Sequence, residues 1–269
     1  MRTKNFPKLV DFPKYNQIRR GPPTTISLLR QAKDLHHFKD LLNDITARDR
    51  KRIEQKTRLQ ADNPFWFEYR KGLVTGTLGR RIVIQAQRRE TSQSLNNAIS
   101  KFGNGRFTNE AMEYGKLSEQ SAVLALWEEF EAAHVDPQMH QSGLCIDPTL
   151  PILAGSPDII LSCLCCSKNG ERCYVIGECK CPHRLRHIGI QGWRDLEYLT
   201  DEGKLRQNHS YNYQQNIYCG VYEASKCLFI IWTPHGHITL EIPFDEALFK
   251  TIKESTEYYY FNHYVKNFF

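Results

Sequence analysis

Two short stretches of the chain decide its fold: Gly155-Ser-Pro-Asp158-Ile-Ile-Leu161, and Gly177-Glu178-Cys-Lys180, in which the glutamate follows the aspartate by twenty residues. The segments 159–166 and 173–180 are apolar, β-branched or rich in cysteine, and a turn containing Asn-Gly joins them, which predicts a β-hairpin. Side chains alternate along a strand, so Glu178 and Lys180 share one face while Cys179 points to the other.

The register of this hairpin brings the charged residues together. A turn near Asn169 pairs residues whose numbers sum to about 338, which sets Asp158 opposite Lys180 and diagonal to Glu178. Two carboxylates and an amine therefore converge at one end of the hairpin. A solvated charge triplet is the alternative, but strands this apolar are usually covered on both faces, and charges near a core are paired or functional.

A predicted helix over residues 109–134 adds a third acid. Glu119 falls on one helical stripe with Val123, Leu126, Trp127 and Phe130, and this spacing points it toward the sheet. The alternative is a Glu119 that reaches into water from the edge of the stripe. Three acids and a lysine are what metal-assisted phosphodiester hydrolysis needs: carboxylates hold Mg²⁺, and the lysine orients the attacking water or neutralises developing charge.

These motifs resemble the PD-(D/E)XK nuclease superfamily, with Pro157-Asp158 as its proline-aspartate and Glu178-Cys-Lys180 as its E-x-K. Within it the chain is similar to the YqaJ-like viral recombinases and lambda-type alkaline exonucleases. The matching segments follow in the family's order and cover roughly residues 54–243: Gln60 and Trp66, Arg70 to Thr77, Tyr114 to Glu119, Ala154 to Asp158, Tyr213 to Asn216, and Phe229 to Pro234.

The resemblance implies a role for each residue of the motif. Glu119, Asp158 and Glu178, with the backbone carbonyl of Cys179, would bind Mg²⁺, with Mn²⁺ as a possible substitute. Lys180 would act on the attacking water.

The resemblance also implies DNA contacts. Arg70 and Thr77 fall where the phage enzymes bind the 5′-phosphate of the end being digested, and a guanidinium suits that group. Arg70 as a cap of its own aromatic helix is the alternative. Gln214 and Asn216 stand for the Gln-x-Gln that the family places on the active-site side of the following helix. Asn216 is one methylene shorter than the usual glutamine.

The rest of the sequence predicts a mixed α/β fold. The expected elements are an irregular arm over 1–25, helices over 27–59, 65–71 and after 77, a loop over 90–108, a helix over 205–222, strands at 227–233 and 238–242, and a closing helix from Asp245. We expect a restriction-endonuclease-like core, with a mixed central β-sheet flanked by helices. The expected domains are a basic arm and helical extension over 1–52 and a nuclease domain over 53–269.

Charge and composition agree with a nucleic-acid partner. Residues 1–90 carry 21 Lys and Arg against 9 Asp and Glu, and the remainder carries 15 against 21, within a net charge of +6. A basic front half favours an anionic partner, although charge scattered for solubility is the alternative. The longest apolar run, Leu228–Trp232, is far short of the roughly 20 residues a membrane span needs. The N-terminus lacks a signal segment, so we expect an intracellular protein, nuclear or cytoplasmic.

The nine cysteines are expected to be thiols. Six of them, with His183 nearby, invite a zinc site: Cys163, Cys165, Cys166, Cys173, Cys179 and Cys181. Their spacing is unlike C-x₂-C pairs, and most fall inside the predicted strands, so buried thiols are the preferred interpretation.

The predicted function is Mg²⁺-dependent DNA hydrolysis, with a 5′→3′ exonuclease on double-stranded ends, in recombination or repair, as the specific expectation from the resemblance. An endonuclease of the same superfamily is one alternative. A DNA-binding module without catalysis is another, and the presence of all three acids and the lysine argues against it. Because phage relatives work as rings, a homo-oligomer is a candidate assembly, and a single-strand annealing protein is a candidate partner. No membrane partner is expected.

Overall fold

The computed structural model describes residues 21–100, 109–166 and 170–269. Its central sheet has five strands in the order β2-β5-β6-β7-β8, and β6 and β7 run parallel while the other neighbours are antiparallel. The strands are β2 (Gln138–His140), β5 (Ile159–Cys163), β6 (Cys173–Lys180), β7 (Lys226–Thr233) and β8 (Gly236–Pro243). The predicted mixed sheet and its two hairpins are confirmed.

A second, three-stranded sheet lies beside the first, in the order β1-β4-β3. Its strands are β1 (Val74–Thr75), β3 (Cys145–Ile146) and β4 (Leu153–Gly155). β1 begins four residues after Arg70, and β4 ends three residues before Asp158. The pairing of β1 with β4 therefore places these two segments side by side.

The helices are α1 (Thr25–Gln31), α2 (Leu35–Asn43), α3 (Ala47–Lys56), α4 (Pro64–Arg70), α5 (Gly79–Arg88), α6 (Gln93–Ser100), α7 (Glu110–Ala133), α8 (Ser210–Tyr222) and α9 (Glu246–Tyr259). The helical region expected over 27–59 is three helices, each with its own N-cap: Thr24, Asp34 and Thr46. The helix expected from residue 205 begins at Ser210. Leu205 instead forms an isolated β-bridge with Leu199.

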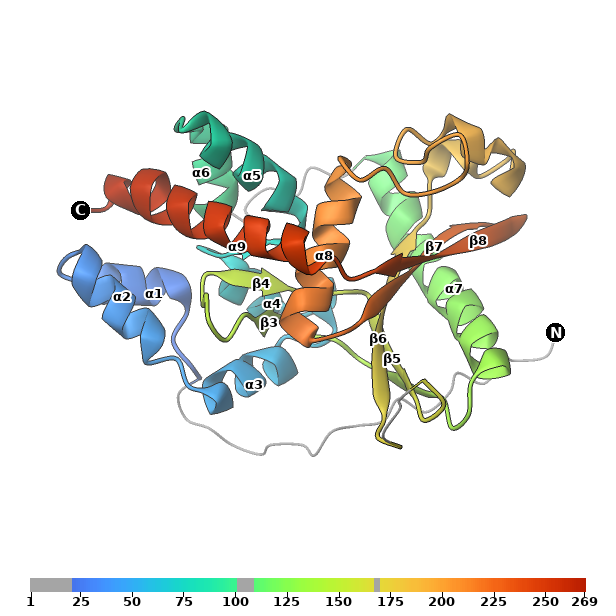
Figure 1. Ribbon diagram of the computed structural model, residues 1–269, viewed down its shortest axis with the longest axis horizontal. Coiled ribbons are helices and arrows are strands. Elements are labelled where there is room, and N and C mark those ends of the chain that lie inside the picture. The colour runs from blue at the N-terminus through green and yellow to red at the C-terminus, as the bar shows by residue number, and fades with distance from the viewer. Residues whose placement is uncertain (1–20, 101–108, 167–169) are drawn as a thin grey trace.

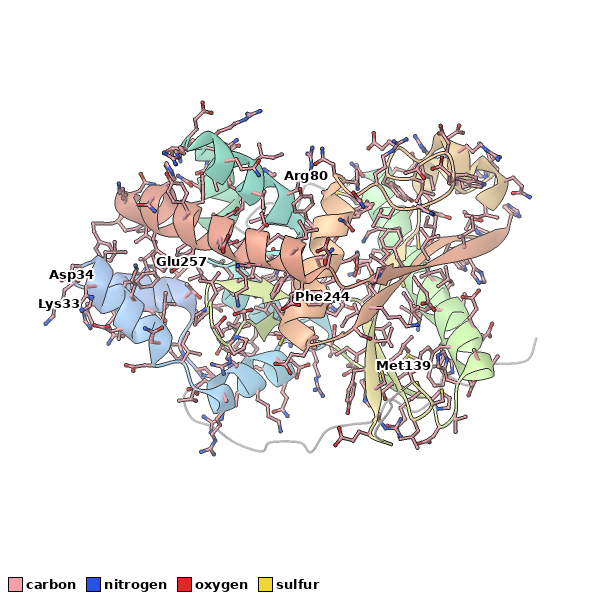
Figure 2. All side chains as sticks on the ribbon, in the orientation of Figure 1. Lys33, Asp34, Arg80, Met139, Phe244 and Glu257 are labelled. Carbon is pink, nitrogen blue, oxygen red and sulfur yellow. The ribbon has the colours of Figure 1, made fainter. Side chains whose placement is uncertain are left out.

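Helices cover both faces of the central sheet (Figure 1). On one face α7 packs its apolar stripe, Ala122, Leu126, Trp127 and Phe130, against side chains of β2, β5, β6 and β7. On the other face α8 packs against β6 and β7 in a larger core that α5 and α9 extend. Phe244 lies beside α8 ahead of α9, and its ring contacts Phe249 with 5.6 Å between centroids (Figure 2). The sheet is therefore buried on both sides, as its apolar strands predict.

The register of the β5–β6 hairpin differs from the prediction. Ile159 pairs with Gly177 and Cys163 with Cys173, so Asp158 falls in line with Glu178 and not with Lys180. The shift is two residues, and a shift of two keeps every side chain on its expected face. The predicted turn near Asn169 falls on residues 167–169, which lie outside the described residues.

The loop expected over 90–108 is wrong for its first half, because α6 occupies Gln93–Ser100. Leu95 and Ile99 lie one helical turn apart and are both fully buried. The amide oxygen of Asn96 accepts a hydrogen bond from the hydroxyl of Tyr259 at 2.9 Å. Two apolar residues were too few to reveal this helix amid Ser and Asn, and the tertiary contacts with the C-terminal region stabilise it.

The N-terminal helices join the main core. Leu28 and Leu29 of α1 and Phe38 and Leu42 of α2 are buried in the same cluster as the side chains of α5 and α9. α3 runs across the expected boundary at residue 52, and the division into two domains stays a prediction. The irregular arm expected over 1–25 lies mostly outside the described residues. Within them, no helix is long and apolar enough to cross a bilayer.

Replacing Leu95 by Ala should lower the free energy of unfolding by about 2–5 kcal/mol, because the change leaves a cavity where α6 meets the core. Leu117→Ala removes the same atoms from α7, where the side chain is 82% exposed. It should change the free energy of unfolding by less than about 0.5 kcal/mol. Urea unfolding of both variants measures the difference, and equal losses would contradict the packing of α6.

Candidate active site

A cleft of about 730 Å³ opens at the end of the β5–β6 hairpin, and it gathers most of the residues singled out in the sequence. Its lining includes Arg70 and Thr77 from the N-terminal half of the chain, Glu119 from α7, Asp158 and Glu178 from the hairpin, and Gln214 from α8. Lys180 joins this group through its contact with Glu178. The structure thus brings together residues that lie up to 144 positions apart in the sequence.

Glu178 is the centre of the site. Its side chain is almost fully buried, and its Oε1 accepts hydrogen bonds from Lys180 Nζ at 2.6 Å and from Gln214 Nε2 at 3.1 Å. Its Oε2 is also buried, and no hydrogen-bond donor within the described part of the chain reaches it. A buried carboxylate oxygen without a donor is costly unless a cation or water binds it.

Lys180 stays charged in this setting. Its Nζ lies 4.9 Å from the ring centroid of Tyr211, which packs beside the ammonium group. Burial alone would lower the pKa of Lys180, but the carboxylates of Glu178 and Asp158 outweigh it and hold the pKa well above its usual range. A protonated lysine donates hydrogen bonds and carries a positive charge.

Asp158 is positioned by backbone contacts. Its Oδ2 accepts a hydrogen bond from the backbone N–H of Cys179 at 2.7 Å, which ties the start of β5 to β6. The preceding carbonyl, that of Pro157, accepts hydrogen bonds from the Gln60 amide at 2.6 Å and from the Ser142 hydroxyl. Burial raises the pKa of Asp158.

Glu119 lines the cleft from α7, three residues before the buried part of that helix begins at Ala122, and its side chain is exposed. Desolvation by the neighbouring cleft wall, and then the charge of Asp158, raise its pKa to about 7. Burial and the same neighbour raise the pKa of Glu178 to about 8. Without a cation these acids repel one another, and this repulsion is the condition that favours binding of a divalent metal ion.

The three acids fit such an ion. Glu119, Asp158 and Glu178 supply hard oxygen ligands, which Mg²⁺ prefers. The unpaired Oε2 of Glu178 is a ligand atom with no competing donor among the described residues. Their number and type, together with the burial of Glu178, therefore suit one or more divalent cations.

Arg70 is a buried cation at the same cleft. Its Nη1 donates to Ser156 Oγ at 2.8 Å and its Nη2 to Thr75 Oγ1 at 3.2 Å, while its guanidinium stacks over the ring of Trp66 at 4.1 Å. These contacts reach across to β1 and to the residue before Pro157, so Arg70 is more than a cap of its own helix. Burial lowers its pKa to about 10, which leaves it charged. Thr77 is exposed on the cleft lining.

The structure does not bring Asn216 to this cleft. Its Nδ2 donates to the carbonyl of Asn212 at 2.9 Å, and its Oδ1 accepts from the backbone N–H of Asp245 at 2.8 Å. Asn216 therefore ties α8 to the start of α9. Residues two apart on a helix differ by about 200° in direction, so Gln214 and Asn216 cannot face one site from a regular helix.

Three residues that sequence reasoning gave no role also line the cleft: Gln60, Ser156 and Tyr218. Tyr218 accepts a hydrogen bond from Gln214 Nε2 at 2.7 Å, and its position one turn after Gln214 was the signal that could have found it. Ser156 accepts hydrogen bonds from both Arg70 and Trp66 Nε1. No sequence periodicity links these three residues, because they come from separate segments.

Comparisons with known proteins give the family and the fold of the chain. The chain matches the viral alkaline exonuclease family over residues 16–181, which is more than half of its length. No sequence among the curated proteins matches it significantly.

Several solved structures share the fold. An alkaline exonuclease from Laribacter hongkongensis has a TM-score of 0.52 at 20% identity, covering 76% of this chain and 89% of its own. A SOX–DNA complex has a TM-score of 0.52 at 13% identity, over 91% and 78%. The SOX–RNA complex from Kaposi's sarcoma-associated herpesvirus has 0.55 at 12%, over 88% and 79%. The predicted restriction-endonuclease-like α/β fold is confirmed.

Mg²⁺ should raise the melting temperature more at pH 9 than at pH 6. The folded glutamates, with pKa values of about 7 and 8, hold protons that the unfolded chain releases near pH 4.5. In EDTA these bound protons contribute to the free energy of unfolding. Their contribution is complete below pH 4.5 and is lost as the pH rises through about 8. At pH 6 Mg²⁺ must displace the protons, which weakens its binding about tenfold or more.

Differential scanning calorimetry with Mg²⁺ or EDTA at both pH values measures this difference. Glu119→Gln should shrink the response to Mg²⁺ at pH 9, because it removes one ligand and one titrating group. Glu131→Gln changes an exposed glutamate near the far end of the same helix and should leave the response intact. An equal response of the unmodified protein at both pH values would contradict the assignment.

Proposed function

Since the chain belongs to the viral alkaline exonuclease family and is a nuclease, we propose that it is a Mg²⁺-dependent 5′→3′ exonuclease that digests double-stranded DNA from its ends in recombination or repair. The carboxyl group of Glu178 carries this proposal. Lys180 and Gln214 hold one of its oxygens, while the other is buried beside the cleft with no donor among the described residues.

Glu119, Asp158, Glu178 and the carbonyl of Cys179 would hold the Mg²⁺, which when bound polarises the phosphate and lowers the pKa of a coordinated water. The protein's own part is positioning and charge. The Cys179 N–H fixes the Asp158 carboxylate, and Gln214 fixes that of Glu178. Lys180, held protonated, donates a hydrogen bond that orients the attacking water and neutralises charge on the pentacovalent phosphate.

Arg70 and Thr77 support recognition of a DNA end. A buried guanidinium, already oriented by Ser156, Thr75 and Trp66, is a preorganised site for a terminal phosphate at the same cleft as the acids. The exposed hydroxyl of Thr77 adds a donor. Binding of the 5′-phosphate there would present the adjacent phosphodiester to the carboxylates, which favours an exonuclease over an endonuclease.

The charge of the chain and the complexes of its relatives indicate the substrate and the partners. The basic excess of residues 1–90 favours a nucleic acid. The SOX relatives form complexes with DNA and with RNA, so RNA is the competing substrate. We include Mn²⁺ as a substitute metal, further copies of the chain as an assembly, and a single-strand annealing protein as the partner that would take up the strand left by digestion.

Purified protein with Mg²⁺ should release a 5′ label from linear duplex DNA and leave a covalently closed circle intact. Lys180→Ala should lower the rate by about 10²–10⁴-fold, because it removes a donor that acts on the developing charge. Lys226→Ala is the matched control, since this lysine forms an exposed ion pair with Glu241 on β8, and it should digest DNA at the normal rate.

Each of the other possible results would contradict a different part of the proposed function. Cutting of the circle would establish the endonuclease. Faster loss of a labelled RNA than of DNA would overturn the substrate. Release of the 3′ label first would reverse the polarity, and binding without cleavage in Mg²⁺ and in Mn²⁺ would remove the catalytic role of the site.

Thr77→Val should reduce the preference for 5′-phosphorylated ends over 5′-hydroxyl ends by about tenfold, because a hydrogen bond to a charged group is worth about 1.5–3 kcal/mol. Thr77 is exposed, so the change should leave the fold intact. Thr251→Val, at an exposed position of α9, is the matched control. The measurement is the ratio of initial rates on the two substrates, and an unchanged ratio would place the 5′-phosphate elsewhere.

A further inference from the structure

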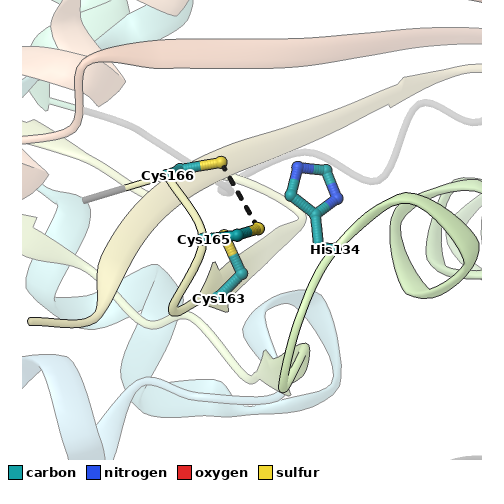
Figure 3. Close-up of side chains that lie close together, drawn as sticks. All are labelled: His134, Cys163, Cys165 and Cys166. Atoms are coloured by element: carbon teal, nitrogen blue, oxygen red, sulfur yellow. Dashed lines mark hydrogen bonds between the residues drawn. The ribbon is translucent and has the colours of Figure 1, made fainter. Parts of the chain in front are cut away.

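A second cluster of ligand-type side chains lies at the opposite end of the same elements (Figure 3). His134 caps the C-terminus of α7, Cys163 ends β5, and Cys165 and Cys166 follow directly after β5. One potential ligand atom from each residue lies within 4.8 Å of those of the other three. We propose that these four residues bind a structural Zn²⁺ ion.

The spacing of the sulfur atoms suits one ion. The Sγ atoms of Cys165 and Cys166 lie 4.0 Å apart. With a Zn–S bond of about 2.3 Å, two ligands of a tetrahedron lie about 3.8 Å from each other. The present arrangement needs shifts of less than about an ångström to become a tetrahedral site, whereas a disulfide would require the sulfurs to close to about 2.05 Å.

The orientation of His134 is already set. Its Nδ1 lies 2.9 Å from the carbonyl oxygen of Phe130, and its ring stacks on the Phe130 ring with 3.9 Å between centroids. With the proton on Nδ1 donated to that carbonyl, Nε2 keeps a free lone pair. A ligating histidine usually donates its other ring nitrogen to a carbonyl or carboxylate in this way.

Cys165 has a comparable support. The backbone N–H of Val135, the residue after His134, donates to Cys165 Sγ at 3.3 Å. The contact holds this sulfur beside the backbone of the residue that follows His134, which keeps the two ligands close together.

The chemistry of the four ligands determines which metal the site prefers. Three thiolates and an imidazole are soft ligands that suit zinc, and not the Mg²⁺ expected among the carboxylates. Four protein ligands fill a tetrahedral shell and leave no position for water or substrate, which is typical of a structural site. The neighbouring hairpin residues Cys173, Cys179 and Cys181 lie outside the cluster, and His183 instead contacts Glu110 at 3.0 Å.

The position of the cluster indicates that the ion would hold two structural elements together. It would join the C-terminal end of α7 to the end of β5. Glu119 lies on α7, and Asp158 directly precedes β5. Glu119 and His134 are fifteen positions apart in the sequence, which is about 22 Å along a helix axis. Arg172 of the hairpin strengthens the same junction through an ion pair with Asp136 and a bond to its carbonyl at 2.8 Å. A zinc ion there would hold the helix at a constant position on the sheet.

Metal analysis of the full chain tests this site. Protein produced in zinc-supplemented medium and purified without chelators should contain about one zinc per chain. Cys165→Ser and Cys166→Ser change exposed residues, so they should fold and lose most of the zinc. Cys173→Ser, on the paired strand of the same hairpin, is the matched control and should keep it. Asp158→Asn should also keep it, which separates this site from the acidic cleft.

Two further measurements make the result independent of folding and of nuclease activity. Co²⁺ bound in place of zinc should give thiolate-to-metal charge-transfer absorption that Cys166→Ser abolishes. A zinc-selective chelator should lower the melting temperature of the unmodified protein and not that of Cys166→Ser. Because no DNA is involved, a failure here leaves the proposed nuclease function standing.

Four outcomes would overturn the proposal. They are zinc-free unmodified protein, zinc retained by both serine variants, iron in place of zinc, and a disulfide between Cys165 and Cys166 detected by mass spectrometry of the protein purified without reductant.

Discussion

The ion pair between the buried Glu178 and the half-buried Lys180 is the constraint on which the rest of the structure depends. Removing two charges from water is costly, and the cost is offset only when their geometry and remaining hydrogen bonds are good. Lys180 Nζ lies 2.6 Å from Glu178 Oε1, and Gln214 donates to the same oxygen. Each partner therefore has to be held in place, which requires a rigid β6 and an α8 packed firmly upon it.

The strand that carries this pair is covered on both faces. Alternation along β6 directs Val175 and Cys179 into the core under α7, and Ile176 into the core that includes α8. A Cβ at Gly177 would lie 2.4 Å from Ile159 Cγ2 and 2.9 Å from Leu126 Cδ2, so a glycine allows α7 to approach closely at this point. That approach brings Glu119 to the end of the hairpin. The same packing that buries the strand therefore gathers the acids.

α7 and the β5–β6 hairpin have chemically different ends. Carboxylates and a lysine gather at one end, where a hard cation would assist hydrolysis, and thiols with an imidazole gather at the other, where a soft cation would fasten the same elements together. Both arrangements follow from one helix crossing one hairpin. A single contact between two elements would thus serve catalysis at one end and stability at the other, if both proposed sites bind their ions.

The sequence by itself determined the features that depend on local periodicity. Strand alternation put Glu178 and Lys180 on one face, and helical spacing put Glu119 on the apolar stripe of α7, so the fold class and the acidic site could be predicted from particular residues. The motif order was enough to indicate the nuclease family.

Tertiary structure alone decided what depends on distant segments. The hairpin pairs two residues away from the predicted register, so Asp158 lies level with Glu178. Contacts with Tyr259 stabilised α6 in a stretch that reads as a loop. The hydrogen bond from Asp245 fixed Asn216 at the start of α9, and the C-terminal end of α7 brought His134 to the cysteines. None of these leaves a periodic signal in the sequence, because each depends on how separate elements pack against one another.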